Sequence, residues 1–337
     1  DKISQIFMNK INTERLTSII PNEGNSSFIG AHGKQHTIQR AISCSGVALH
    51  TGSKVSLTLH PADQNTGIIF RRTDLTGSND IQASWDNVVD TQLSTKIGNE
   101  QGETAGTIEH LMAALSGCGV DNAYIELDGP EVPVMDGSAQ PFVSLIEEVG
   151  LCEQEAACKM IEILKPVRVE IGDKVAELTP GNDFCVSCDI DFCDTIIVNQ
   201  SMTTTVNSEI FKRELAPART FGFMHDVERL KEAGLGLGGS LDNAVIVDGD
   251  RVLNKEGLRY KNEFARHKVL DAIGDLYTAG GKILGTYKGI KSGHSITNQL
   301  LRTLFADNTA WRYGAPESQI IKNMVNTPIE VNNCCAI

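Results

Sequence analysis

The sequence predicts an α+β fold made of two similar domains. Its 337 residues suit about two domains, and 41% hydrophobic with 22% charged residues is ordinary globular composition. A helix, a glycine turn and a strand follow one another near 107–127 and again near 264–287. We therefore expect a duplicated sheet-plus-helices unit, with the helix layers of the two domains packed together and a small insertion in each.

The first domain is predicted to span 36–158. Residues 1–35 are polar and turn-rich, so we expect a disordered arm or a cloning remnant there. The elements expected in the domain are alternating strands between Thr37 and Pro61, a helix at 107–116, a strand at 123–127 and a helix at 143–149.

The second domain is predicted to span 159–306, with a polar tail at 307–337. The elements expected in it are strands at 167–171 and 184–192, a helix at 264–278, a strand at 283–287 and a helix at 295–304. Residues 234–239 fit GxGxxG, but a helical pattern at 226–233 precedes them where a dinucleotide fold requires a strand. Gly234 is therefore predicted to cap that helix.

Charge and composition exclude several classes of partner. A formal charge of −13 argues against a sequence-independent grip on nucleic acid or an anionic membrane, because both require excess Lys and Arg. No apolar run reaches the roughly 18 residues of a membrane span, and the N-terminal residues lack the pattern of a signal peptide. We expect a cytoplasmic monomer with a small-molecule substrate and at most peripheral membrane contact.

The nine cysteines show no regular framework, which favours reduced thiols. Cys185 and Cys188 form a CxxC, but they lie on an alternating strand, where residues three apart face opposite ways, so zinc binding is not expected there. The final residues 334–337 match a prenylation box, which we attribute to chance in a chain that otherwise looks bacterial.

The helix at 264–278 has one polar face. At about 100° per residue, the stripe is formed by His267, Lys268, Asp271 and Asp275. His267 and Asp271 lie one turn apart, which lets both reach a single divalent ion. The alternative is a solvated face with one incidental ion pair.

A second polar pair is predicted on the helix at 107–116. Its apolar stripe faces a core, which leaves Glu109 and His110 pointing away, and Thr107 is a candidate N-cap. In the first turn the helix dipole would favour ionised Glu109, as a general base requires. The alternative is a polar surface. His294 lies near another predicted helix start, and the alternative for it is a loop histidine.

Eight segments of the chain carry a family resemblance. They are 46–50 (GVALH), 70–74 (FRRTD), 107–111 (TIEHL), 133–139 (PVMDGSA), 218–223 (ARTFGF), 237–240 (LGGS), 267–275 and 291–294 (KSGH). In this order they resemble the UDP-3-O-acyl-N-acetylglucosamine deacetylase (LpxC) family, from about His36 to Asp307. The resemblance implies a zinc amidase that removes an acetyl group in the committed step of lipid A synthesis in Gram-negative bacteria.

The resemblance also implies roles for individual residues. It gives His110, His267 and Asp271 as ligands of one Zn²⁺ at the domain interface, although such a set also suits Fe²⁺. It gives Glu109 as general base, His294 as the second histidine beside Asp275, Thr220 as the oxyanion contact and Lys268 as a nearby positive charge.

The remaining implied residues bind substrate. Phe192 lies where the family has a ring near the uridine, Phe221 where it contacts the sugar, and Lys291 where it has a basic residue, with Gly293 allowing close approach. The acyl chain is expected in an insertion at about 222–248, where the lining residues are Val227, Gly236, Ser240 and Leu241. The alternative there is a local mini-core. Ser94 stands where some members have a cysteine near the metal.

Three protein ligands leave a fourth position at which zinc lowers the pKa of water, with Glu109 accepting the proton and protonated His294 donating to the leaving amine. We therefore expect turnover to have a bell-shaped dependence on pH. The competing hypotheses are a metal amidase for a different N-acetylated sugar and a non-catalytic binding protein.

Overall fold

The computed structural model describes residues 33–77, 79–192 and 195–314. Two sheets with the same strand order dominate this part of the chain. The strands of the first sheet lie in the order β2 (Ile42–Val47), β3 (Lys54–Pro61), β9 (Ala123–Leu127), β4 (Ile68–Arg72) and β5 (Asp80–Gln82). In this sheet β9 is antiparallel to β3 and parallel to β4.

The second sheet repeats this arrangement around β19. Its corresponding path is β12 (Val167–Ile171), β13 (Lys174–Thr179), β19 (Lys282–Ile290), β14 (Phe184–Ile190) and β15 (Gln200–Thr205). Strand β19 is antiparallel to β13 and parallel to β14, as β9 is to β3 and β4. Strands β11 (Met160–Ile163) and β20 (Trp311–Tyr313) extend this sheet. The α+β class with duplicated units is therefore confirmed.

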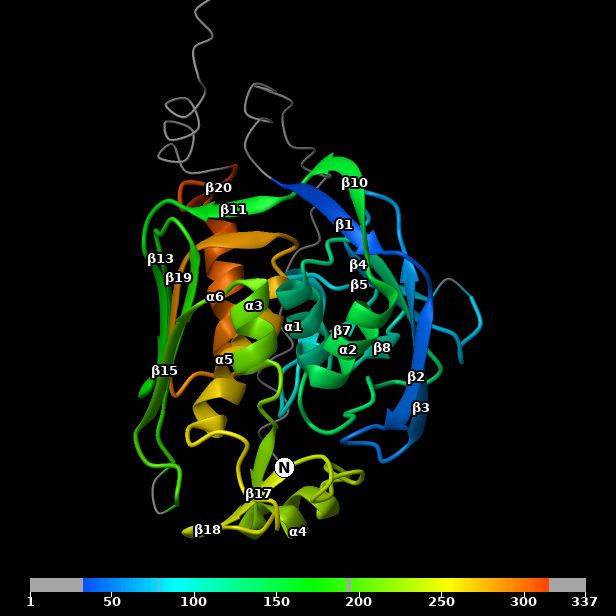
Figure 1. Ribbon diagram of the computed structural model, residues 1–337. Coiled ribbons are helices and arrows are strands. Elements are labelled where there is room, and N and C mark those ends of the chain that lie inside the picture. Colours follow the sequence, from blue (N-terminus) through cyan, green and yellow to red (C-terminus); the bar gives the residue numbers. More distant parts are fainter. Residues whose placement is uncertain (1–32, 78, 193–194, 315–337) are drawn as a thin grey trace, which may run out of the picture. The chain divides into compact units, whose positions relative to one another are not determined.

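The main helices also repeat. Helix α1 (Glu109–Cys118) precedes β9 and α2 (Gln140–Val149) follows it; α5 (Glu263–Tyr277) precedes β19 and α6 (His294–Ala306) follows it. Figure 1 shows these helices between the two sheets, with α1 and α5 next to each other. Both faces of α1 and α5 are thus covered, which explains why their polar residues are buried.

Gly274 permits the close approach of α5 to α1. A Cβ atom at this position would lie 2.0 Å from the carbonyl oxygen of Glu109 and 3.1 Å from the backbone nitrogen of Ala113. Real Cβ atoms do not approach other heavy atoms so closely, so only glycine fits this crossing.

The smaller elements form separate layers around this frame. Near the first sheet they are β1 (Lys34–Ile38), η1 (Trp85–Asn87), β6 (Val88–Asp90), β7 (Lys96–Gly98), β8 (Thr104–Ala105) and β10 (Leu151–Ala157). In the second half they are α3 (Ser208–Ile210), the π-helix η2 (Phe211–Leu215), β16 (Phe221–Phe223), α4 (Met224–Glu232), β17 (Val245–Asp248) and β18 (Arg251–Val252). The predicted insertion at 222–248 contains α4 and most of a three-stranded sheet.

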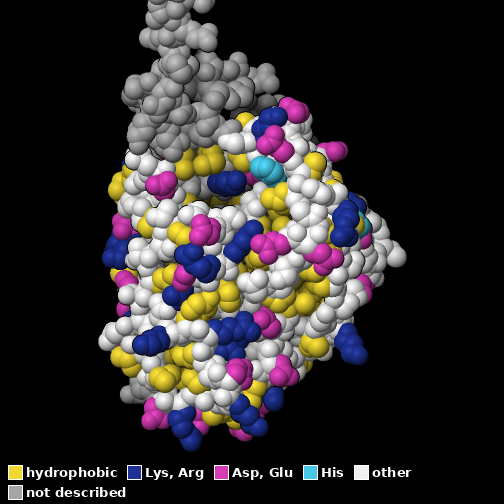
Figure 2. All heavy atoms as spheres, in the orientation of Figure 1, with side chains coloured by type: hydrophobic (Ala, Val, Ile, Leu, Met, Phe, Trp, Pro, Cys, Tyr) yellow, Lys and Arg dark blue, Asp and Glu magenta, His cyan; other side chains and the backbone are white. Residues whose placement is uncertain are grey.

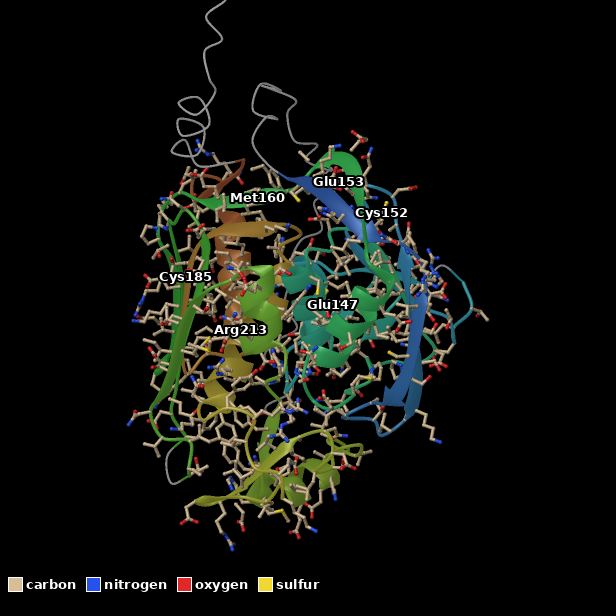
Figure 3. The ribbon with its side chains drawn as sticks, viewed as in Figure 1. Glu147, Cys152, Glu153, Met160, Cys185 and Arg213 are labelled. Carbon is tan, nitrogen blue, oxygen red and sulfur yellow. The ribbon has the colours of Figure 1, made fainter. Side chains whose placement is uncertain are left out.

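Side chains of η2 reach across to the first half. Figure 3 labels Arg213 on η2 and Glu147 on α2, and the neighbouring Lys212 pairs with Glu147 at 2.9 Å between Nζ and Oε1. Figure 2 shows that acidic and basic side chains are interspersed on this face. No helix among the described residues has the length and apolar character needed to cross a bilayer.

Some predicted boundaries shift. Strand β1 begins at Lys34, inside the predicted arm, α2 begins at Gln140 rather than 143, and β20 lies in the predicted tail. Residues 1–32 and 315–337, which include the prenylation-like residues 334–337, lie outside the described residues. The division into domains at 158/159 stays a prediction.

The two predicted helix caps have different outcomes. Gly234 directly follows the α4 cap residue Ala233 in a left-handed conformation (φ 73°), so its capping role is confirmed. Thr107 is not the N-cap of α1: that position belongs to Ile108. Thr107 adopts φ 54°, and its hydroxyl donates instead to Oε1 of buried Glu131 at 2.8 Å.

Candidate active site and metal centre

Three predicted metal ligands converge where α1 packs against α5. His110 projects from α1 and His267 and Asp271 from α5, and their ligand atoms all lie within 4.8 Å of one another. Nε2 of His267 is 3.2 Å and Nε2 of His110 3.5 Å from Oδ1 of Asp271. Each residue is at most 6% exposed. The alternative of solvated helix faces is therefore wrong.

The donor set fits a cation. Nδ1 of His267 donates to the carbonyl of Ala218 at 2.9 Å, and in that tautomer Nε2 presents a lone pair to Asp271. Oδ1 of Asp271 is buried and has no hydrogen-bond partner among the described residues. Acceptors that face one another in a buried space are unfavourable unless a positive ion lies between them.

Lys268 lies against this cluster. Its Nζ is 2.8 Å from Oδ2 of Asp271. Although burial favours the neutral carboxyl, His267 and Lys268 hold the pKa of Asp271 well below its usual value. Burial likewise opposes the charge of Lys268, but Asp271 keeps its pKa above the usual value. Both groups therefore stay charged, and the carboxylate is available as a ligand.

Glu109 lies beside the cluster at the start of α1. It is 4% exposed, and its Oε2 accepts a hydrogen bond from the backbone N–H of Thr95 at 3.0 Å. Burial raises the pKa of Glu109 to about 7, although His294 opposes the shift. The start of the helix does favour the ionised form, since a backbone hydrogen bond there lowers the pKa, but desolvation outweighs it. A pKa near neutrality suits a general base.

His294 is the first residue of α6, and Gly293 is its N-cap. Its Nδ1 donates to Oδ2 of Asp275 at 2.7 Å, and its Nε2 lies 3.8 Å from Oε1 of Glu109. Burial lowers the pKa of His294, but Asp275 and Glu109 outweigh burial and raise it to about 9. His294 is therefore not a loop histidine, and it is poised to carry a proton opposite Glu109.

The sequence analysis missed Thr95. Its backbone N–H reaches Glu109 and its hydroxyl donates to Oδ1 of Asp275 at 2.6 Å. No local pattern marks it, because its partners lie 14 and 180 positions away along the chain. Its neighbour Ser94 lines a separate cavity of about 170 Å³ that also contacts His50.

An apolar cavity of about 370 Å³ is lined in part by Phe221, whose ring lies 6.3 Å from that of His267 between centroids. Five predicted substrate residues line it, namely Phe221, Val227, Gly236, Ser240 and Leu241, together with Thr220. The sequence did not single out the lining residues Leu49 and Leu93, which come from the first half of the chain. The insertion therefore encloses a hollow together with the first half, while its Val245 and Val247 also pack in a small core with Phe264.

The other predicted substrate residues, Phe192, Lys291 and Gly293, are not part of the lining of this cavity. The ring of Phe192 lies 5.7 Å from that of Phe221, edge to face, between centroids. Lys291 precedes α6, and its Nζ is 3.0 Å from Oδ2 of Asp173 and 3.8 Å from Oδ2 of Asp191.

The cysteines take no part in the cluster. Cys185, labelled in Figure 3 on β14, and Cys188 on the same strand are free thiols, as are the other four cysteines of the described ranges to which a state is assigned. Burial raises the pKa of Cys188 to about 12, which disfavours a thiolate ligand.

Comparison with known proteins gives consistent matches. Residues 35–306 match the LpxC family model, described as UDP-3-O-acyl N-acetylglycosamine deacetylase. A protein of Idiomarina loihiensis named UDP-3-O-acyl-N-acetylglucosamine deacetylase is 53% identical over 83% of this chain and 92% of its own length. A protein of the same name from Shewanella loihica is 51% identical over 82% of this chain and 91% of its own length. Another, from Vibrio vulnificus, is 50% identical over 85% of this chain and 95% of its own length.

Proposed function

The chain belongs to the UDP-3-O-acyl N-acetylglycosamine deacetylase family, and we propose that it hydrolyses the acetamide of UDP-3-O-(3-hydroxyacyl)-N-acetylglucosamine. The products are acetate and the UDP-3-O-acyl-glucosamine, in the committed step of lipid A biosynthesis. The observation that carries the proposal is the convergence of His110, His267 and Asp271 beside Glu109. We place the reaction in the cytoplasm, where UDP-sugars are made.

His110, His267 and Asp271 would hold one Zn²⁺ per chain. When bound, the ion supplies Lewis-acid chemistry, lowering the pKa of water and polarising the amide carbonyl. A site of two histidines and one carboxylate also accommodates Fe²⁺, so the metal used in the cell depends on supply.

Glu109 is the proposed general base. Thr95 holds its Oε2, which leaves Oε1 on the side of His294 to accept the proton of the attacking water. Its pKa of about 7 lets it be deprotonated near neutral pH and still bind the proton it removes.

His294 is the proposed general acid. Its Nδ1–H is committed to Asp275, so the proton on Nε2 is the one delivered to the departing sugar amine. Nε2 faces Oε1 of Glu109 at 3.8 Å. Acid and base therefore face the same point, as attack and departure at one amide carbon require.

Thr220 and Lys268 are proposed to stabilise the oxyanion. Thr220 is held by its backbone, since its N–H donates to Gly137 at 2.7 Å and its carbonyl accepts from Val245 at 2.8 Å. Its side chain borders the acyl cavity next to the cluster. Lys268 contributes positive charge while paired with Asp271.

The substrate is proposed to lie across both halves of the chain. The acyl chain occupies the 370 Å³ cavity, with Val227, Gly236, Ser240 and Leu241 in its wall. Phe221 contacts the sugar, Phe192 lies near the uridine, and Lys291 and Gly293 at the start of α6 face the diphosphate. The ring of Phe192 suits the uridine, the ammonium group of Lys291 suits the diphosphate, and the apolar cavity suits the acyl chain.

Acetate release from the UDP-linked acyl sugar, measured on chelated protein and after addition of one equivalent of Zn²⁺, tests the proposal. We expect turnover only in the metal-loaded protein. Release of acetate from N-acetylglucosamine lacking UDP and acyl groups at a similar kcat/KM would instead identify an amidase with a different sugar substrate.

A further inference from the structure

We propose that Thr95 is a positioning residue that bridges Glu109, the proposed base, and Asp275, the partner of the proposed acid His294. The roles of base and acid rest on the proposed function, whereas the contacts of Thr95 do not depend on it. Thr95 is 3% exposed and lies between the turn after β6 and the start of β7. Thr95 is not one of the three candidate metal ligands and does not line the acyl cavity, so the only role considered for it so far is its bond to Glu109.

Thr95 makes two different donor contacts. Its backbone N–H donates to Oε2 of Glu109 at 3.0 Å, and its hydroxyl donates to Oδ1 of Asp275 at 2.6 Å. Glu109 is on α1 and Asp275 is on α5, so one residue of the β6–β7 turn joins carboxylates of both helices. Both bonds are buried, so losing either would leave a buried polar atom without its partner.

These bonds complete a closed circuit of four residues. The second oxygen of Asp275 accepts from Nδ1 of His294 at 2.7 Å, and Nε2 of His294 faces the second oxygen of Glu109 at 3.8 Å. Each carboxylate thus has one oxygen held by Thr95 and one directed at His294. Thr95 therefore determines how both carboxylates are rotated around the imidazole.

Thr95 is itself anchored to α1. Its carbonyl accepts from the N–H of Ile108, the residue before Glu109, at 3.3 Å. Two residues earlier, Leu93 adopts the left-handed φ of 65°, which a leucine rarely takes unless the surrounding structure imposes it. The turn therefore has a fixed path, and it delivers the Thr95 hydroxyl to Asp275 at a set place.

The first test compares three variants of the zinc-loaded enzyme. T95V removes the hydroxyl at nearly constant volume, and T95S restores it. T37V is the matched control, because Thr37 is also buried and its hydroxyl also has hydrogen-bond partners, the backbones of Asn122 and Ala62, away from the site. The readouts are kcat, KM and the midpoint of thermal unfolding.

We expect T95V to lower kcat by about 10-fold or more with KM little changed, because misplaced catalytic groups slow the chemical step. T95S should recover most of kcat, and T37V should lower the unfolding midpoint without lowering kcat. Equal kcat losses in T95V and T37V, or none in T95V, would overturn the proposal.

A double-mutant cycle tests whether Thr95 acts through Asp275. D275N removes the acceptor charge, so T95V should cost far less in that background than in the wild-type enzyme. Fully additive losses would contradict a bridge between the two residues.

A third measurement does not depend on turnover. In protein labelled with ¹⁵N-histidine, the Nδ1–H proton of His294 is identified as the signal lost in H294N. We expect this signal to shift in T95V but not in T37V. If the shift occurs and the enzyme fails to release acetate, the bridge stands and the proposed function fails; an unshifted signal overturns the bridge.

Discussion

Two buried carboxylates, Asp271 and Glu109, differ in their partners, and this difference separates their proposed roles. Asp271 has the ammonium group of Lys268 2.8 Å from its Oδ2, and its pKa lies well below the usual value, so it stays ionised. Glu109 has one backbone donor and no cation within hydrogen-bonding distance among the described residues, so burial raises its pKa to about 7. Because their environments push the pKa values of these two carboxyl groups apart, Asp271 suits a metal ligand and Glu109 suits a general base.

Glu109→Gln removes the proposed base while keeping its size and its bond from Thr95. We expect kcat to fall about 100- to 10,000-fold, the usual range for a general base, with bound metal unchanged. Acetate release and metal content measure the two effects. The control is Glu126→Gln, which alters a half-exposed carboxylate bonded to His60. Wild-type turnover in Glu109→Gln would remove Glu109 from the mechanism.

Asp275→Asn should move the alkaline limb of the pH profile. In the proposed mechanism activity requires protonated His294, so it should be lost as pH rises through the pKa of His294, which Asp275 and Glu109 raise to about 9, with a smaller contribution from Asp271. Removing the charge of Asp275 lowers that pKa, so the limb shifts to lower pH.

The measurement is kcat/KM from pH 6 to 10, with Asp128→Asn, an exposed carboxylate bonded to Ser56, as control. A limb that stays in place in Asp275→Asn would mean that His294 is not the group titrating there.

At the scale of elements, the crossing of α1 and α5 determines the site. Each helix alone presents a polar stripe that the sequence predicts from helical periodicity. Their burial could not be predicted locally, because it depends on the second helix covering the first. Gly274 lies at the point of contact, where its missing Cβ leaves room for the backbone of Glu109.

Gly274→Ala should separate the two helices and weaken metal binding. An added Cβ would overlap the carbonyl of Glu109, so we expect a loss of about 1–3 kcal/mol in unfolding free energy and reduced affinity for Zn²⁺. Denaturant unfolding measures the free energy of unfolding, and competition with a chelator measures the affinity for Zn²⁺. Gly33→Ala, where the new methyl meets no atom within 4 Å, is the control. Unchanged metal affinity in Gly274→Ala would contradict this role of the crossing.

The insertion containing α4 should determine acyl-chain length. Ser240→Leu places a branched side chain at the wall of the 370 Å³ cavity, so the preferred acyl chain should become shorter. Gly236 is less suitable for substitution, because its φ of 64° strains any side chain. Turnover of substrates of graded chain length is the measurement. Ser201→Leu on the exposed side of β15 should leave the preference unchanged, and an unchanged preference in Ser240→Leu would place the chain elsewhere.

At the scale of the whole molecule, the duplication connects fold and site. The order helix, glycine turn, strand is visible in the sequence, and the structure confirms it as two five-strand paths with matching neighbours. Family membership, predicted from ordered motifs, is confirmed by the match over 35–306. These features could be predicted because they depend on periodicity and motif order within short windows.

Other features depend on contacts between distant parts of the chain. Thr95 is bonded to a residue 180 positions away, and Leu93 reaches a cavity formed mostly by the insertion. The raised pKa of Glu109 reflects burial between two helices, which the dipole of its own helix did not predict. The residue type of Thr107 predicts a helix cap, yet its hydroxyl is bonded to Glu131.

The central claim is that ligands from both halves bind one divalent ion on which deacetylation depends. Titration of chelated protein with Zn²⁺, following bound metal and acetate release together, tests it most directly in the wild type and in Asp271→Ala. We predict that activity rises with metal to a plateau at one ion per chain, and that Asp271→Ala loses tight binding and turnover together. Full turnover in the chelated protein, or unchanged binding and turnover in Asp271→Ala, would contradict the account.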